Sequence, residues 1–278
     1  MTGARDSLAD RLGRYLARKL TEPSPGAVPY THANVAALRR TLLPGDVLLV
    51  EGNTRVSIAI KYLTMSTWSH AALYVGNAVG RVNADGEPLT LVEVNLGEGC
   101  IAAELSKYES YNTRICRARG LSDEDRARLI DFMVSSIGKR YDMKNIADLV
   151  RYFMPTPPVP VRLRRRMLAF GSGDPTRAIC SSLIAEGFQR IGYPILPVIT
   201  RAFRANPRAR SQRREILHIR HHSLFAPRDF DLSPYFQIVK PTIETGFDYR
   251  SLKWSDQPPP HDVLAAPVAE VAQGLRNR

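Results

Sequence analysis

Residues 68–76 read Trp-Ser-His-Ala-Ala-Leu-Tyr-Val-Gly, and this stretch decides how the rest of the chain is interpreted. The apolar run from Ala71 to Val75 is short and is followed by a glycine, which is typical of a buried strand. His70 stands where this predicted strand begins, so the backbone holds its imidazole rigidly while one ring nitrogen stays accessible. An imidazole changes protonation near neutral pH, and His70 is therefore the candidate general base.

Three further segments read as strands. They are residues 46–50 (DVLLV), 89–95 (LTLVEVN) and 111–118 (YNTRICRA). The first follows a Pro-Gly turn, and the sequence Asn-Ala-Asp-Gly at 83–86 has the turn chemistry of a hairpin between the His70 strand and the next one. The pattern predicts antiparallel pairing in this part of the chain.

Glu93 interrupts the apolar segment 89–95 with a carboxylate, which is costly to bury without a partner. If the two hairpin strands pair, Glu93 lies beside His70, orients its ring and stabilises its charged form. An alternating strand would equally well turn Glu93 toward solvent. Asn95 lies two residues further along on the same face and is the reserve residue for orienting the ring.

Helix signals dominate the later part of the chain, after a short predicted helix at residues 55–65. Ser122 precedes three acidic residues and is a good N-cap. Further helices are predicted at 142–153 and at about 179–191, where Gly192 ends the last one. The sequence therefore predicts an α+β fold in which an antiparallel sheet packs against helices.

Cys180 opens the predicted helix at 179–191, in the sequence Ile-Cys-Ser-Ser. Unpaired N–H groups and the helix dipole at such a position stabilise a thiolate. A thiolate is a nucleophile when a base stands nearby, and the same N–H groups can hold an oxyanion. The alternative for a lone cysteine is a buried structural role. Cys100 and Cys116 lack a helix start and are interpreted as structural.

The composition is that of an ordinary globular protein with an excess of positive charge. The chain has 278 residues, 44% of them hydrophobic, and a formal net charge of +12. This charge favours contact with anions such as nucleic acid, an anionic membrane surface or an acidic substrate. No signal peptide and no window of 18 or more apolar residues is found, so the cytoplasm is the expected location. The three cysteines have no metal-type spacing.

Several of these segments together resemble the YaeF/YiiX-type permuted papain-like amidases of the NlpC/p60 superfamily of thiol hydrolases. The resemblance is carried by Leu-Pro-Gly-Asp-Val-Leu-Leu-Val at 43–50, the His70 block, the Glu93 strand, Gly-Lys-Arg-Tyr-Asp at 138–142 and Ile-Cys-Ser-Ser at 179–182. It spans roughly residues 38–240 and includes Ala-Pro-Arg-Asp-Phe-Asp-Leu-Ser-Pro-Tyr at 226–235.

This resemblance implies a circularly permuted papain-like fold in which the His and acid strands precede the Cys helix. It implies Cys180 as the nucleophile, His70 as general base and acid, and Glu93 as the residue that orients the ring. Tyr141 matches a tyrosine that lies near the active site in the family. With Trp68 and Ser181 it forms the candidate set for substrate binding or the oxyanion.

The domain organisation follows from the same reading. Residues 1–37 are predicted to form a basic amphipathic helix and a linker, and residues 38–240 to form the hydrolase domain. A Pro- and Arg-rich insertion occupies about 155–177, and residues 241–278 form a C-terminal extension that is partly loosely ordered. Short members of the family lack a segment like this insertion. Its presence therefore affects the prediction of the substrate more than the prediction of the catalytic chemistry.

The expected activity is cleavage of a peptide or isopeptide-type amide through an acyl-enzyme. The first alternative is an acyl-lipid hydrolase or acyltransferase on an anionic membrane, bound through the N-terminal helix and Arg162–Arg166. The second is a catalytically silent binding module. No specific nucleic-acid partner is expected, because no recognition module is found, and no cofactor is expected. No metal site is expected either, since the His-x-x-His-His motif at 218–222 contains an arginine and lacks an acidic ligand.

Overall fold

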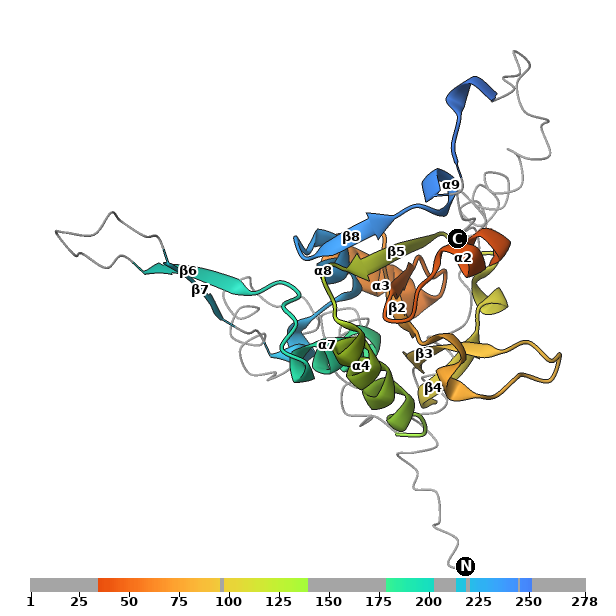
Figure 1. Ribbon diagram of the computed structural model, residues 1–278, viewed down its shortest axis with the longest axis horizontal. Coiled ribbons are helices and arrows are strands. Elements are labelled where there is room, and N and C mark those ends of the chain that lie inside the picture. Colours follow the sequence, from red (N-terminus) through yellow and green to blue (C-terminus); the bar gives the residue numbers. More distant parts are fainter. Residues whose placement is uncertain are drawn as a thin grey trace, which may run out of the picture.

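The computed structural model describes residues 35–95, 98–139, 179–202, 214–218, 221–244 and 246–251 (Figure 1). A six-stranded sheet with the order β4-β3-β2-β1-β5-β8 forms its centre, and every pair of neighbouring strands is antiparallel. The strands are β1 (Val47–Val50), β2 (His70–Tyr74), β3 (Leu89–Asn95), β4 (Gly99–Glu104), β5 (Thr113–Ala118) and β8 (Phe236–Val239). The fold is α+β, with the antiparallel sheet packed against helices, as the sequence predicted.

Three helices pack on one face of the sheet: α4 (Asp123–Ser135), α7 (Ile179–Arg190) and α8 (Pro227–Leu232). One apolar cluster joins their buried side chains to alternate residues of the central strands, such as Leu49 and Leu73. Helices α4 and α7 lie side by side in Figure 1 and approach closely at Gly187, where an added Cβ would lie 2.7 Å from Leu129 Cδ1. This contact fixes α7 against the sheet.

The opposite face of the sheet is covered by α2 (Val35–Thr41) and by the 3-10 turn η2 (Ser106–Tyr108). A second apolar cluster joins Leu38 of α2 and Tyr108 of η2 to the remaining strand residues, including Leu48 and Ala72. Helix α2 begins at Val35, inside the stretch expected to be a linker, because Leu38 and Leu42 bury their side chains here. Both faces of the sheet are therefore covered.

The remaining elements connect or extend this core. Helix α3 (Arg55–Thr64) links β1 to β2, and the antiparallel pair β6 (Val198–Ala202) and β7 (Arg214–His218) projects away from the sheet on the left of Figure 1. Helix α9 (Pro241–Glu244) packs against α2. Further 3-10 turns are η1 (Gly76–Val79), η3 (His222–Leu224) and η4 (Tyr249–Ser251).

Local sequence signals account for most element boundaries. The segment 89–95 forms β3 with the predicted limits, and Ser122 caps α4 by accepting a hydrogen bond from the Asp125 N–H at 3.1 Å. Strand β4 follows β3 in a hairpin and was not predicted, because its short sequence alternates only weakly. The predicted helix at 142–153, the insertion at 155–177 and most of 1–37 lie outside the described residues.

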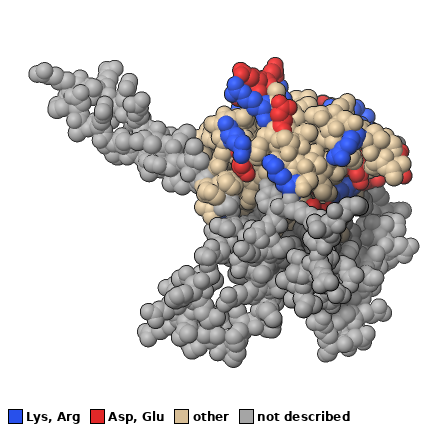
Figure 2. Space-filling view, turned by 90° about the horizontal axis from the view of Figure 1, so that it is seen from below, with Lys and Arg blue, Asp and Glu red and all other residues tan. Residues whose placement is uncertain are grey.

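The surface charges of the described residues are mixed in sign. On the described part of the face seen in Figure 2, cations and acids are interspersed and form no large patch of one sign. Pairs such as Arg126 with Asp123 and Arg128 with Glu124 on α4 place opposite charges next to each other. A search of the described helices finds none that is long and apolar enough to span a membrane.

Candidate active site

The pairing of β2 with β3 brings His70 and Glu93 together. Ala72 lies opposite Glu93 in the antiparallel register, so His70 is its diagonal neighbour on the same face of the sheet. The Nε2 atom of His70 lies 3.1 Å from Oε2 of Glu93. The sequence had left open whether Glu93 faces solvent, and the structure places it at 0% exposure against the histidine.

Two side chains from η2 complete the surroundings of the Glu93 carboxylate. Lys107 donates from Nζ to Oε1, and the Tyr108 hydroxyl donates to Oε2. Burial alone would raise the pKa of Glu93, but the hydrogen bond and charge of His70, followed by those of Lys107, lower it from 4.5 to about 2. Glu93 is thus a buried carboxylate that stays ionised, since its lone pairs are satisfied by donors.

Cys180 enters the site from the first turn of α7, which packs against β2 and β3. Its side chain is 5% exposed. It lies near enough to His70 to raise the pKa of that ring. The helix that carries Cys180 therefore packs against the strands of His70 and Glu93, and the imidazole contacts the carboxylate.

The electrostatics of His70 reflect both Glu93 and Cys180. Burial alone would lower the pKa of His70, but the charge and hydrogen bond of Cys180, followed by those of Glu93, raise it from 6.5 to about 10. The side chain keeps 18% of its surface exposed. A histidine with this pKa is an imidazolium at neutral pH.

The other two cysteines have a different environment. Cys100 and Cys116 are fully buried on strands β4 and β5. Burial raises the pKa of the Cys100 thiol to about 11, and it raises the pKa of the Cys116 thiol further. Both thiols therefore remain protonated at neutral pH, which makes them poor nucleophiles.

The remaining candidate residues take other positions. The Trp68 indole N–H donates to Asp231 Oδ2 at 3.0 Å, and the Asn95 amide donates to Glu98 rather than to the histidine. The Ser181 hydroxyl is fully buried and donates to the carbonyl of Phe225 at 2.6 Å, which ties α7 to the chain before α8. Tyr141 and Arg162–Arg166 lie outside the described residues.

Lys107 and Tyr108 were not identified from the sequence. They follow β4, and only the folding of η2 back across the sheet brings them to Glu93. The one signal in the sequence is the pair itself, a cation beside an aromatic residue that can donate, located shortly after the Glu93 strand. A buried acid needs hydrogen-bond donors, and Lys107 and Tyr108 are donors that follow shortly after the strand paired with the Glu93 strand.

Comparison with known proteins adds one structural similarity. No protein-family model and no curated protein matches the chain. Among solved structures, the chain is similar to the metalloprotein YiiX from Escherichia coli O157:H7, with 15% sequence identity and a TM-score of 0.40 over 72% of this chain and 97% of that chain. Within the described part of this chain, no group of three or more His, Cys, Asp or Glu side chains is arranged to hold a metal ion.

Proposed function

We propose that this protein is a cysteine hydrolase with a circularly permuted papain-like fold, in which Cys180, His70 and Glu93 act as a triad. The observation that carries the proposal is the 3.1 Å contact between His70 and the buried, ionised Glu93, on strands against which the helix that carries Cys180 packs. Nucleophile, base and orienting acid are recognised by their mutual geometry, whatever their order along the chain.

The reaction proceeds in two stages through an acyl-enzyme. The Cys180 thiolate attacks the carbonyl carbon of the substrate and forms a C–S bond, and the carbonyl oxygen takes up the negative charge beside the N-terminal end of α7. His70 gives its proton to the leaving amine or alcohol as the bond to carbon breaks. His70 then takes a proton from water, which attacks the thioester and releases the acid and the thiolate.

Glu93 acts on this chemistry through the histidine. Because Glu93 engages Nε2, the Nδ1 atom is the ring nitrogen left to exchange a proton with the thiol. The carboxylate also stabilises the imidazolium that forms when the thiol ionises. Lys107 and Tyr108 keep the carboxylate ionised and fixed in place.

Two classes of acyl substrate fit this chemistry. A peptide or isopeptide-type amide is the class expected from the sequence. An acyl-lipid ester is the second candidate, and the exposed apolar side chains of Ile58, Tyr62 and Met65 along α3 and at its end favour it. The chemistry at Cys180 is the same for both, since each presents a carbonyl carbon and a leaving group that must be protonated.

The proposal is tested by trapping the acyl-enzyme. The full chain is incubated with N-acyl peptides and with phospholipid vesicles, and intact-protein and peptide masses are recorded. We expect an added acyl mass on Cys180 with at least one substrate class, together with release of the free acid. The variant Cys180→Ala should lose both signals, and the matched variant Cys100→Ala should keep them. Turnover by Cys180→Ala would overturn the proposal.

A further inference from the structure

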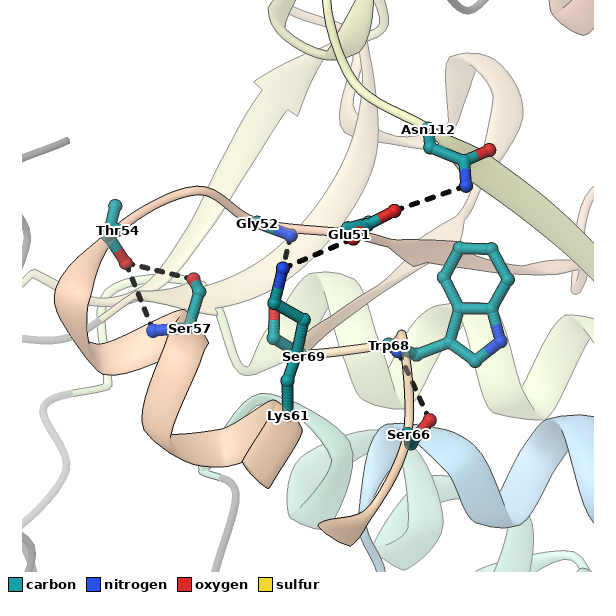
Figure 3. Close-up of polar contacts among 9 residues, drawn as sticks. All are labelled: Glu51, Gly52, Thr54, Ser57, Lys61, Ser66, Trp68, Ser69 and Asn112. Atoms are coloured by element: carbon teal, nitrogen blue, oxygen red, sulfur yellow. Dashed lines mark hydrogen bonds and ion pairs between the residues drawn. The ribbon is translucent and has the colours of Figure 1, made fainter. Parts of the chain in front are cut away.

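Helix α3 lies next to the candidate active site because both of its ends are anchored there. Strand β1 ends at Val50, which pairs with His70, and the chain then leaves the sheet, forms α3 and returns to β2 at His70. The Gly52 N–H donates to the Ser69 hydroxyl at 2.9 Å, which joins the departing and returning segments (Figure 3). The helix has 10 residues, a length of about 15 Å, so all of it stays near this end of the sheet.

The helix is held in place at both ends. Thr54 caps its start by accepting a hydrogen bond from the Ser57 N–H, and the C-cap N–H bonds to the carbonyls of Lys61 and Tyr62. Lys61 in turn pairs with Glu51 at 3.1 Å, and Figure 3 shows this contact beside the Gly52–Ser69 bond. Helix α3 is therefore capped at both ends, and its last turn is tied to the residue that follows β1.

One face of this helix presents large apolar side chains to solvent. Ile58, Tyr62 and Met65 are 43%, 81% and 88% exposed, and their spacing of four and three residues places them on one side of the helix. Single exposed apolar residues are common on protein surfaces, but a row of three beside an active site is characteristic of a binding surface.

Met65 adds an independent observation. It is the only described non-glycine residue with a positive φ, at 47°, in the left-handed conformation at the end of α3. Glycine or asparagine normally occupies this position, because a Cβ is strained there. The chain instead places a flexible apolar side chain at this position and leaves it 88% exposed. Because it is not buried, this side chain contributes little to the stability of the fold. A strained, exposed apolar residue of this kind indicates a role outside the fold.

Cations exceed acids around this face, although Glu51 pairs with Lys61 and Asp229 Oδ1 lies 3.9 Å from Arg228 Nε. Helix α3 contains Arg55 and Lys61 and has no acidic residue. Arg55 is exposed at its first turn, and Arg228 of α8 donates to the carbonyl of Thr64 at its last turn. An apolar row with an aromatic hydroxyl and flanking arginines matches the boundary between headgroups and acyl chains of an anionic bilayer.

We propose that the face of α3 formed by Ile58, Tyr62 and Met65 docks the protein on an anionic phospholipid surface, so that the site beside it acts on acyl lipids. The choice of substrate rests on the proposed hydrolase function, whereas the docking does not. The apolar side chains enter the boundary region and the arginines contact lipid phosphates. The acyl lipid then reaches Cys180 and His70 from the same surface.

The test separates docking from catalysis. Binding of the full-length Cys180→Ala variant is measured by flotation with vesicles of phosphatidylcholine containing phosphatidylglycerol, and with vesicles of phosphatidylcholine alone. The double variant Tyr62→Ser, Met65→Ser is compared with the matched double variant Phe247→Ser, Tyr249→Ser, which removes two side chains that are 52% and 64% exposed elsewhere. All of these side chains are exposed, so the fold should be retained, and circular dichroism checks this.

We expect binding to the anionic vesicles that is weakened roughly tenfold or more by the α3 variant and is unchanged in the matched variant. Equal binding by both variants, or equal binding to neutral vesicles, would overturn the proposal. A dimer that the α3 variant dissociates would also overturn it, because a second copy would then occupy this face.

A second measurement uses the enzyme with Cys180 intact. The rate of lipid hydrolysis on vesicles should fall in the α3 variant, while the rate on a soluble short-chain ester should stay the same. If neither substrate is cleaved but the α3 variant still loses vesicle binding, the proposed hydrolase function is wrong and the membrane docking through α3 is retained. If a soluble ester is cleaved and vesicle binding is absent, the docking fails and the hydrolase stands.

Discussion

Tyr108 and His70 approach the same oxygen of a buried carboxylate, Glu93 Oε2, and their rings lie 6.1 Å apart. The tyrosine comes from η2 and the histidine from β2, so the shared acceptor joins the two elements across β3. The carboxylate fixes the histidine, and the tyrosine fixes the carboxylate. The orientation of the imidazole therefore depends on a hydroxyl that does not contact the ring nitrogen.

Removing that hydroxyl should affect both stability and activity. The variant Tyr108→Phe keeps the buried ring and deletes one hydrogen bond to a charged group, so we expect a loss of about 1.5–3 kcal/mol in the free energy of unfolding. Activity should fall because Glu93 is less well positioned. The matched variant Tyr111→Phe changes the neighbouring ring, whose centroid lies 5.8 Å from that of Tyr108. Chemical denaturation that gives equal losses for the two variants would contradict this assignment.

Neutralising the acid should weaken the histidine as a base. In Glu93→Gln the charge that stabilises the His70 imidazolium is lost, and the hydrogen bonds with Lys107 and Tyr108 are altered. We expect kcat/KM to fall roughly 10²–10⁴-fold, the range attributed to positioned acid–base groups. The comparison variant Asn95→Ala should change it little, because Asn95 binds Glu98. A larger effect at Asn95 than at Glu93 would show that the asparagine orients the ring.

The raised pKa of His70 gives stability a specific pH dependence. Its pKa is 6.5 when unperturbed and about 10 in the folded protein, so the folded state holds the proton more tightly. The resulting stabilisation is fully present below pH 6.5 and is lost as the pH rises through about 10. The free energy of unfolding measured across this interval should decline in the wild-type protein.

The variant His70→Gln supplies the reference for that measurement. It should lack the part of the decline that His70 causes, since glutamine does not titrate. Glu93 has the opposite sign: its pKa falls from 4.5 to about 2, so its stabilisation is present above pH 4.5 and is lost as the pH falls through about 2. Identical alkaline profiles for the wild type and His70→Gln would contradict the raised pKa.

The contact between α4 and α7 should be sensitive to a single methyl group. A Cβ at position 187 would lie 2.7 Å from Leu129 Cδ1 and 3.1 Å from Phe132 Cδ1. Gly187→Ala must therefore push the helices apart, at a cost of about 1–3 kcal/mol, even though alanine favours helix formation. Thermal unfolding should show this loss, whereas Asp131→Ala on the exposed side of α4 should change stability by no more than about 0.5 kcal/mol. A stabilised Gly187→Ala variant would refute the close contact.

Local patterns predicted much of the sheet and the main pair of the site. The apolar runs at 47–50 and 89–95 are short, bounded and rich in residues that favour strands, and the hairpin between His70 and Glu93 follows from its turn residues. Ser122 followed by acids fixed the start of α4 by a local hydrogen bond. These features depend on neighbours along the chain, so the sequence contains them directly.

Features that depend on distant contacts were not predicted. Strand β8 pairs with β5 although more than a hundred residues separate them, and no local signal sets that register. Lys107 and Tyr108 reach Glu93 only through the path of η2, and the exposure of Met65 depends on the orientation of α3. Residue types at the site can be read along the chain, whereas tertiary packing determines which donors reach the carboxylate.

The measurement that tests the central claim most directly is the rate of alkylation of each cysteine by iodoacetamide as a function of pH, with the modified sites identified by mass spectrometry. The account predicts that Cys180 reacts much faster than Cys100 and Cys116 at neutral pH, and that His70→Ala removes this advantage. Equal protection of all three cysteines in the native protein, or unchanged Cys180 reactivity in His70→Ala, would contradict an activated cysteine–histidine pair.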